Sequence, residues 1–210
     1  MKYKVMIVED QTMPRELFEL RIQASEHFEV ALSIDNAALA DVYCLRFPVD
    51  LILMDVITRD GENGLDAAAR IKRAFPQIKI IIVTSMPECS YLKRAKEIGV
   101  ESFWYKEEQR ESLLDVMERT MNGESVYPGA PPELTLGMAS SYQFTERELD
   151  ILREITSGDT NQEIADRLNM SVATVKTHIL NMLEKTGFRN RTELAVRARE
   201  SGLVILNRRN

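Results

Sequence analysis

Leu51-Ile52-Leu53-Met54-Asp55 is a run of four large apolar residues that ends in a carboxylate. A short, continuous apolar run of this kind predicts a strand buried on both faces of a sheet. Open α/β sheets bind ligands outside the carboxyl ends of their strands, so we expect Asp55 at the ligand-binding edge. Taken alone, an aspartate in this position is more commonly a turn or cap residue.

A second strand, Lys4-Val5-Met6-Ile7-Val8, also ends in acids, Glu9 and Asp10. Two such ends side by side place three carboxylates at one edge, where like charges repel unless a cation neutralises them. Oxygen ligands suit Mg²⁺, which usually keeps several waters and takes one or two protein carboxylates. The two strand ends together therefore predict a Mg²⁺ site.

Five apolar strands alternate with five helical segments over the first 121 residues, and the strands are expected at 5–8, 28–33, 51–55, 78–83 and 101–105. This alternation predicts an α/β fold with parallel strands, right-handed crossovers and helices on both faces of the sheet. One expected helix buries Leu17, Phe18 and Ile22. Another is capped by Asp35 and ends at Arg46, and its apolar face carries Ala38, Leu39, Val42 and Leu45.

Two further strand ends add a hydroxyl and an amine, Thr84 and Lys106. Each can contact an oxygen of a bound anion. A carboxylate nucleophile with Mg²⁺, a lysine and a hydroxyl is the set that phosphoryl transfer to Asp55 needs. Individually, Lys106 is more often a surface lysine and Thr84 a strand-end cap, but their joint placement favours a phosphoryl-transfer site.

With these motifs, residues 1–121 resemble the receiver domain of two-component response regulators, and together with the C-terminal domain discussed below the chain resembles the NarL/FixJ-like subclass. The resemblance implies a flavodoxin-like fold, which is a doubly wound five-stranded parallel sheet. It also implies that Asp55 is the phospho-acceptor. The implied Mg²⁺ ligands are Glu9, Asp10, Asp55 and the backbone carbonyl of Ile57.

The same resemblance implies that Thr84 and Lys106 contact the phosphoryl group, and that Phe103 changes rotamer when the Thr84 hydroxyl moves. A phosphoryl group adds roughly −1.5 to −2 charge and strong acceptor oxygens, which can drive such a switch. Two features depart from the family pattern. The loop at 56–62 is one residue longer than usual, and Glu107 stands where many relatives have proline.

Composition limits the other possibilities. No apolar run approaches the roughly 20 residues of a membrane helix, and the chain begins close to its first strand, without the pattern of a secretory signal. Cys44 and Cys89 lack metal-like or redox-motif spacing, so we expect free buried thiols in a reducing cytoplasm. The net charge of −6 is uneven, because residues 144–210 carry 11 basic and 10 acidic residues and the preceding part carries 16 and 23.

The stretch 122–143 is rich in turn residues and lacks periodicity, which predicts a tether between two domains. A packed surface loop is the alternative. Beyond it, Thr145-Glu146-Arg147-Glu148 and Thr160-Asn161-Gln162-Glu163 are capping boxes that each begin a helix. Ser171 is expected to cap a third helix ending at Gly187, and Thr192 a fourth.

A short helix, a tight turn and a longer helix form the helix-turn-helix plan, so we expect residues 144–210 to be a small all-α domain of four helices. Asn169 can adopt the left-handed turn that this plan needs. The expected outward face of the third helix carries Thr174, Lys176, Thr177, Leu180, Asn181 and Lys185. A solvated helix face explains these residues about as well in isolation.

Residues 144–148, 161–165 and 171–178 also resemble the LuxR-type helix-turn-helix domain. The resemblance implies that Lys176 and Thr177 approach bases in the major groove. Thr174 and Lys185, with Arg189 or Arg191, are implied to meet phosphates, and Asn181 belongs to the same DNA-binding face. A single such domain discriminates weakly, so we expect a homodimer on two half-sites.

The chain is therefore interpreted as a cytoplasmic response regulator and transcription factor rather than an enzyme. A sensor histidine kinase is expected to phosphorylate Asp55, which switches dimerisation and binding to double-stranded promoter DNA. One alternative is a DNA-binding regulator whose receiver acts as a phosphorylation-independent protein-interaction module. A second is a phosphatase that uses Asp55 as a nucleophile, which the absence of an acid at Ile57 disfavours.

Overall fold

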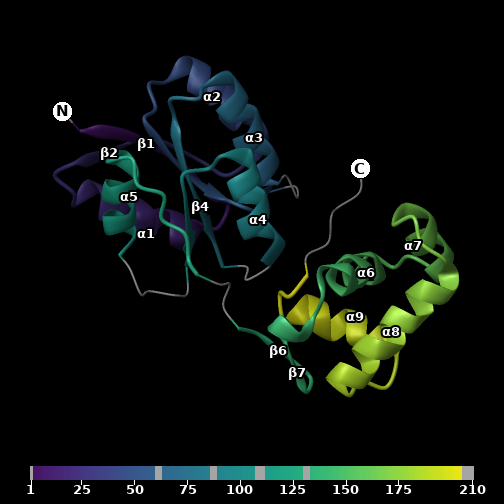
Figure 1. Cartoon of the computed structure of the whole chain (residues 1–210). Coiled ribbons are helices and arrows are strands. Elements are labelled where there is room, and N and C mark those ends of the chain that lie inside the picture. Colours follow the sequence, from purple (N-terminus) through teal and green to yellow (C-terminus); the bar gives the residue numbers. More distant parts are fainter. Residues whose placement is uncertain (1, 60–62, 86–88, 107–111, 130–132, 205–210) are drawn as a thin grey trace. The chain divides into compact units, whose positions relative to one another are not determined.

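The structure is a computed structural model that describes residues 2–59, 63–85, 89–106, 112–129 and 133–204. The chain divides into two compact units, one made of Met1–Ser85 with Tyr91–Ala130 and the other containing Pro131–Asn210. Each unit has its own hydrophobic core. Figure 1 shows the strands of the first unit and the helices of the second.

The first unit is a five-stranded parallel sheet in the order β2-β1-β3-β4-β5. Its strands are β1 (Tyr3–Val8), β2 (Phe28–Ile34), β3 (Leu51–Asp55), β4 (Lys79–Thr84) and β5 (Ser102–Tyr105). The intervening helices are α1 (Thr12–Gln23), α2 (Ala40–Arg46), α3 (Gly64–Ala74), α4 (Cys89–Ile98) and α5 (Leu113–Met121). This arrangement confirms the predicted doubly wound α/β fold.

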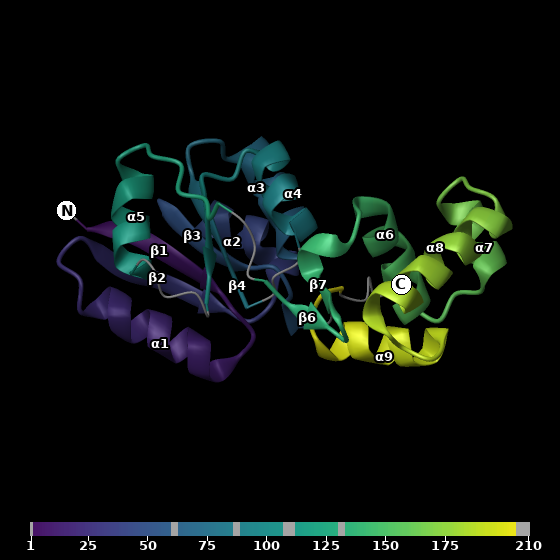
Figure 2. The ribbon, with the colours of Figure 1, turned by 60° about the horizontal axis from the view of Figure 1, so that its bottom comes forward.

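Both faces of the sheet are covered, as the continuous apolar strands predict. Figure 2 shows α1 and α5 on one side and α2, α3 and α4 on the other. Leu51 and Leu53 face the α1–α5 side together with residues of the neighbouring strands. Ile52 and Met54 alternate with them and are equally buried. Every residue of β3 is therefore fixed by packing, and Asp55 is held where the strand ends.

The helix expected from Asp35 to Arg46 differs from the prediction. It begins with a short 3-10 turn, Ala37–Leu39, whose cap is Asn36 rather than Asp35. The expected apolar face is largely wrong, because Leu39, Val42 and Leu45 are exposed. The buried residues are instead Ala37, Ala40 and Cys44, whose smaller side chains let this segment pack closely against α3. Leu17 of α1 is likewise exposed, whereas Phe18 and Ile22 are buried.

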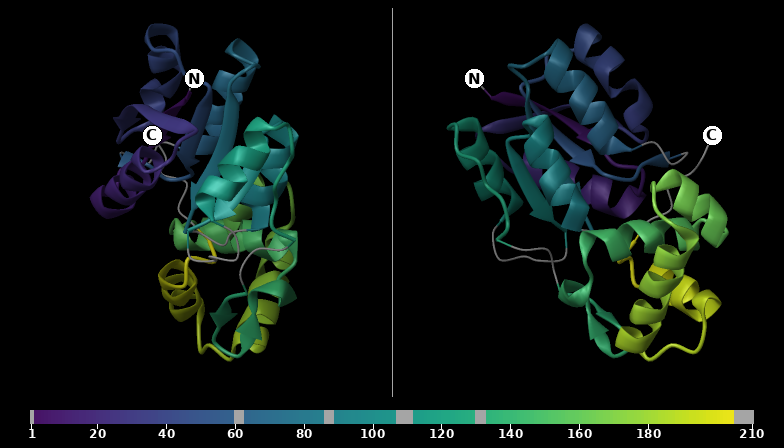
Figure 3. Two further views of the ribbon diagram at one scale, coloured as in Figure 1. Left: turned by 90° about the vertical axis from the view of Figure 1, so that its left-hand side faces the viewer. Right: turned by 45° about the vertical axis from the view of Figure 1, so that its right-hand side comes forward.

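The second unit contains α6 (Glu146–Thr156), α7 (Asn161–Arg167), α8 (Val172–Thr186) and α9 (Arg191–Glu200). Two further views show these green-to-yellow helices packed on one another (Figure 3). Both predicted capping boxes are present, at Thr145 and Thr160, and Ser171 caps α8. The cap predicted at Thr192 is wrong. Asn190 caps α9 instead, because its extended backbone lets its side chain accept a hydrogen bond from the Glu193 amide.

The expected tether at 122–143 is not a tether throughout. Strands β6 (Thr135–Leu136) and β7 (Ala139–Ser140) form a hairpin, and Leu136 and Ala139 belong to the core of the second unit. Gly137 has φ +63°, and a Cβ there would lie 2.1 Å from the Thr186 carbonyl oxygen, so only glycine fits this turn. Two-residue strands are too short to show periodicity in the sequence.

Within the described part of the chain, no helix combines the length and the apolar character that a bilayer crossing requires.

Candidate functional site

The acidic edge of the sheet is formed where β1 and β3 end. These strands pair in parallel, with Val8 beside Met54, so Glu9 and Asp10 emerge next to Asp55. One carboxylate oxygen of each acid lies within 4.8 Å of the others. Glu9 and Asp55 are buried and Asp10 is half-buried. Three hard oxygen donors this close, one of them partly open to solvent, fit a small divalent cation that keeps several waters.

Lys106, which follows β5, reaches into this group. Its Nζ donates to Asp55 Oδ2 at 2.8 Å and to Glu9 Oε2 at 2.5 Å. The lysine side chain is only 10% exposed. The structure therefore brings Glu9, Asp10, Asp55 and Lys106 together from three strand ends, as the sequence predicts for an α/β sheet.

Thr84 ends β4, the strand next to β3. Asp55 pairs with Val83, so Thr84 lies one residue further along the same edge, and it is buried. The Lys106 amide donates to the Thr84 carbonyl oxygen at 2.9 Å, which ties the ends of β4 and β5 together. Phe103 on β5 is buried, and its ring centroid lies 5.0 Å from that of Tyr105 and 6.3 Å from that of Tyr127.

The electrostatics of the edge depend on burial. Burial raises the pKa of the Asp55 carboxyl to about 7; the Lys106 ammonium opposes this effect and the Glu9 carboxylate adds to it. Burial alone would lower the pKa of Lys106, but its contacts with Asp55 and Glu9 outweigh burial and raise that pKa. The amine therefore stays charged, and a cation bound among the acids would favour the ionised form of Asp55.

The loop after Asp55 is held at both ends. Ile57 forms a backbone bridge with Asn63, and the Gly64 amide donates to the Val56 carbonyl oxygen at 2.8 Å. Residues 60–62 of the longer loop, and Glu107, lie outside the described residues. Ile57 is half-buried next to this bridge.

Sequence reasoning missed Gly64 as a residue that shapes the site. A Cβ on Gly64 would lie 1.8 Å from the backbone carbonyl oxygen of Asp55. Only glycine therefore lets α3 begin so close to the end of β3. The Asn63-Gly64 pair predicts a turn, but nothing in it predicts the close approach to the Asp55 carbonyl.

The outward side of α8 in the second unit carries the polar residues expected there. Thr174, Lys176, Thr177 and Asn181 are all exposed, and so is Leu180. The inward side packs on α6 and α7 through Val175, Ile179 and Met182. A helix with one exposed polar face and a capped, accessible N-terminus can enter a DNA groove and meet phosphates.

Lys185 does not lie freely on this face. Its Nζ donates to both carboxylate oxygens of the buried Glu148 at 2.7 Å and to the Gln143 carbonyl oxygen at 2.9 Å. Burial disfavours the charged form of Glu148, but Lys185 and Thr145 hold its pKa below its usual value. Arg191 is similarly engaged, with Asn161 and the Asp159 carbonyl oxygen. Arg189 is exposed.

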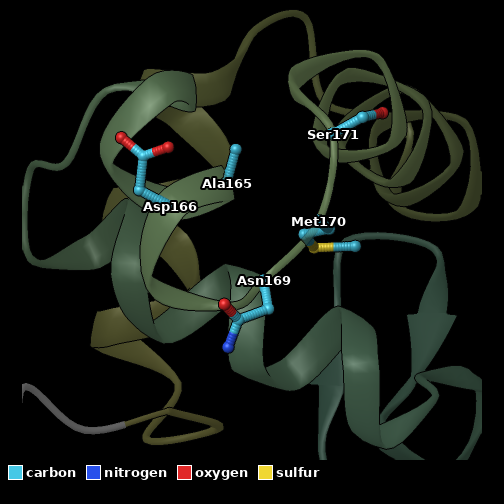
Figure 4. A pocket seen from close by; sticks show the side chains of 5 residues that line it. All are labelled: Ala165, Asp166, Asn169, Met170 and Ser171. Carbon is cyan, nitrogen blue, oxygen red and sulfur yellow. The ribbon is translucent and has the colours of Figure 1, made fainter.

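Between α7 and α8 the chain makes the tight turn that the sequence predicts. Asn169 has φ +52°, and the Met170 amide donates to the Ala165 carbonyl oxygen. Figure 4 shows the side chains around a shallow surface depression of about 560 Å³ at this turn, Ala165, Asp166, Asn169, Met170 and Ser171. Ala165 is buried where the two helices approach, which explains the small side chain.

Two protein families match the chain. Residues 5–118 match the response regulator receiver domain, and residues 142–198 match the bacterial regulatory proteins of the luxR family. The VraR response regulator proteins of Staphylococcus epidermidis and Staphylococcus aureus are 34% and 33% identical to the chain over 212 aligned residues. Each alignment covers 97% of this chain and 100% of the relative.

Solved structures share the fold. A structure of two RcsB dimers bound to two parallel DNAs has a TM-score of 0.63 at 18% identity and covers 94% of this chain and 98% of its own. RcsB from Salmonella enterica serovar Typhimurium, bound to promoter rprA with the phosphomimetic BeF3⁻, has a TM-score of 0.62 at 18% identity, with the same coverage of 94% and 98%. The chain thus belongs to the response regulator family and combines a receiver domain with a LuxR-type DNA-binding domain.

Proposed function

We propose that a sensor histidine kinase phosphorylates Asp55 in the presence of Mg²⁺, and that this phosphorylation switches dimerisation and promoter DNA binding. The observation that carries the proposal is the contact of Lys106 Nζ with Asp55 Oδ2 at 2.8 Å, beside two more acids whose oxygens lie within 4.8 Å. A nucleophilic carboxylate, a charged amine and a cation-binding group therefore meet at one point.

In this proposal Glu9, Asp10 and Asp55 hold Mg²⁺ together with the backbone carbonyl of Ile57. When bound, Mg²⁺ neutralises the charge that gathers around the transferred phosphoryl group. An Asp55 carboxylate oxygen attacks the phosphorus, and the bond from phosphorus to the kinase histidine breaks. Lys106 is already charged and can exchange a carboxylate contact for one to a phosphoryl oxygen.

The switch uses the neighbouring strand ends. The Thr84 hydroxyl donates to a phosphoryl oxygen, and Phe103 fills the space that the hydroxyl leaves. This change alters the surface around α4 and β5, which biases the chain toward the dimer. The structures of RcsB dimers on DNA support the dimeric state. Since promoter DNA is the target, we place the protein in the cytoplasm.

For DNA binding we propose that Lys176 and Thr177 approach base edges, with Asn181 on the same face, and that Thr174 meets a phosphate. These residues lie on the exposed side of α8. We withdraw Lys185 from this set, because its amine is engaged by Glu148. We propose a receiver whose core extends through Val126 rather than ending at residue 121, and a DNA-binding domain that begins near residue 133 rather than 144, with a correspondingly shorter linker.

The test is phosphate incorporation from a small phosphodonor with Mg²⁺. Asp55→Asn should abolish acid-labile phosphate and remove the effect of the donor on sedimentation and DNA binding. Asp50→Asn is the matched control, because Asp50 lies just before the same strand and accepts a hydrogen bond from the Lys4 amide. Persistent labelling of Asp55→Asn would refute the assignment. Specific DNA binding that is unchanged by the phosphodonor would favour the alternative in which the receiver is a phosphorylation-independent protein-interaction module.

A further inference from the structure

The segment that follows α5 folds back onto the edge of the sheet. β5 is the last strand in the sheet order, so its outer edge would otherwise leave backbone groups unpaired. The Phe103 amide donates to the Val126 carbonyl oxygen at 2.8 Å, and the Val126 amide donates to Ser102 Oγ at 3.1 Å. Val126 is buried in the core beside α5.

Two buried hydroxyls stabilise the contact between Val126 and β5. Ser102 Oγ lies 2.7 Å from Thr120 Oγ1, which in turn donates to the Val116 carbonyl oxygen at 2.6 Å. Ser102 and Thr120 are both fully buried. Val126 is thus hydrogen-bonded to β5 directly and linked to Thr120 of α5 through the Ser102 hydroxyl. These bonds fix the segment that follows α5 against β5.

Tyr127, the next residue, packs against the aromatic side chain proposed to switch. Its ring centroid lies 6.3 Å from that of Phe103. Its hydroxyl donates to the Val100 carbonyl oxygen at 2.8 Å, and Lys96 Nζ of α4 lies 5.0 Å from its ring centroid. One residue of the interdomain segment therefore touches α4, the loop after it and the ring of Phe103.

We propose that Tyr127 is a positioning residue that couples the rotamer of Phe103 to the path of the interdomain segment. The proposal rests on the proposed function, in which Phe103 fills the space left by Thr84. Phe103 is buried and its ring packs against that of Tyr127, so Tyr127 favours the buried rotamer that accompanies a phosphoryl group at Asp55. When Phe103 turns outward it displaces the Tyr127 ring, and the segment leading to the DNA-binding domain loses its anchor on α4.

Coupling of this kind is reciprocal. If a phosphoryl group at Asp55 strengthens the contacts of Tyr127, then those contacts must strengthen the binding of a phosphoryl mimic at Asp55 by the same free energy. Removal of the Tyr127 ring should therefore weaken that binding. A residue that only stabilises the fold would change the unfolding midpoint and leave that affinity unaltered. The affinity for a phosphoryl mimic is therefore the discriminating measurement.

The experiment uses the full chain, Mg²⁺ and beryllofluoride, followed by the fluorescence of the single tryptophan, Trp104, which lies on β5 beside Phe103. Tyr127→Ala should weaken beryllofluoride binding about fivefold, a typical allosteric coupling. Tyr127→Phe keeps the ring and should stay within about twofold of the wild type. Tyr3→Ala is the control, because Tyr3 also packs on a phenylalanine, Phe28, on a different strand.

Unchanged or tighter beryllofluoride binding by Tyr127→Ala, with Asp55 still phosphorylated, overturns the coupling and leaves the proposed function intact. Equal weakening by Tyr3→Ala also overturns it, because the effect would then be general. If the wild-type chain binds no beryllofluoride and takes no phosphate at Asp55, the proposed function itself fails. Slower amide hydrogen exchange at Phe103 and Val126 on adding beryllofluoride, absent in Asp55→Asn, would support the coupling independently.

Discussion

Two regions of this chain are expected to meet phosphate oxygens, and they are built in opposite ways. At the receiver edge the lysine is 10% exposed and already bound to two carboxylates. On the outward side of α8 the polar side chains are exposed, and the described residues include no ion-pair partner for Lys176. In the proposed function, the first region is preorganised for one phosphoryl group at a site that is largely shielded from water. The second is proposed to meet DNA, an extended polyanion that exposed and hydrated charges can bind.

The same contrast separates two lysines on a single helix. Lys176 and Lys185 both belong to α8, but Lys185 is directed to the buried Glu148 while Lys176 remains in solvent. A buried charge needs its partner, because an unpaired charge in a protein interior is costly. Loss of Lys185, which pairs with a buried acid, should therefore affect stability first, whereas loss of the exposed Lys176 should affect binding first.

The largest effect is expected for Lys106→Met, which keeps the length of the side chain and removes the amine. Glu9 and Asp55 would remain buried next to each other without a partner, so we expect the receiver to lose roughly 3 to 5 kcal/mol at pH 8 without divalent cations. Denaturant unfolding followed by Trp104 fluorescence measures this loss. Lys2→Met removes an exposed lysine and should change stability by less than about 0.5 kcal/mol. If Lys106→Met and Lys2→Met lowered the free energy of unfolding equally, the desolvated receiver edge would not differ from an exposed surface in its need for a paired lysine.

The pH dependence of the receiver should follow Asp55. Its folded pKa of about 7 lies above its ordinary value of 3.8, so its contribution to stability is complete below about pH 4 and is lost as the pH rises through 7. Between pH 5 and pH 8 in a chelator, we expect a loss of roughly 2 to 3 kcal/mol. Added Mg²⁺ should restore stability at pH 8. Unfolding of Asp55→Asn should be nearly independent of pH over this range, and a slope equal to that of the wild type would exclude Asp55 as its cause.

The sheet and its acidic edge were predictable because both depend on local sequence. A continuous apolar run specifies a doubly buried strand, and parallel strands bring the residues after them to one edge whatever their distance in the chain. Glu9, Asp55 and Lys106 therefore meet for reasons visible in three short segments. The capping boxes at Thr145 and Thr160 were predictable for the same reason, since each is complete within four residues.

The features that escaped prediction depend on partners far apart in sequence. Nothing near Lys185 indicates that Glu148, 37 positions earlier, will bind it. Tyr127 stands in a stretch whose prolines and glycines suggest a tether, although its contacts with Val100 and Phe103 fix it on the sheet. In the segment leading to Arg46 the larger apolar residues suggested the buried face. Ala37 and Ala40 are buried instead. Because this segment packs closely on α3, the size of a side chain as well as its polarity decides whether it is buried.

The smallest effects, and the sharpest form of the comparison, concern Lys185→Met and Lys176→Met. Lys185→Met leaves Glu148 buried without its amine and should cost the DNA-binding domain about 2 kcal/mol. At temperatures where the domain is folded, it should leave the salt dependence of DNA affinity unchanged, because this lysine contacts no phosphate.

Lys176→Met should change stability by less than about 0.5 kcal/mol but weaken binding to a selected duplex about tenfold. Fluorescence anisotropy at several salt concentrations, with chemical unfolding of the same proteins, separates the two outcomes. If Lys185→Met instead lowered the salt slope by about one, the Lys185 amine would have to leave Glu148 and meet the DNA, and pairing with a buried acid would no longer distinguish the two lysines.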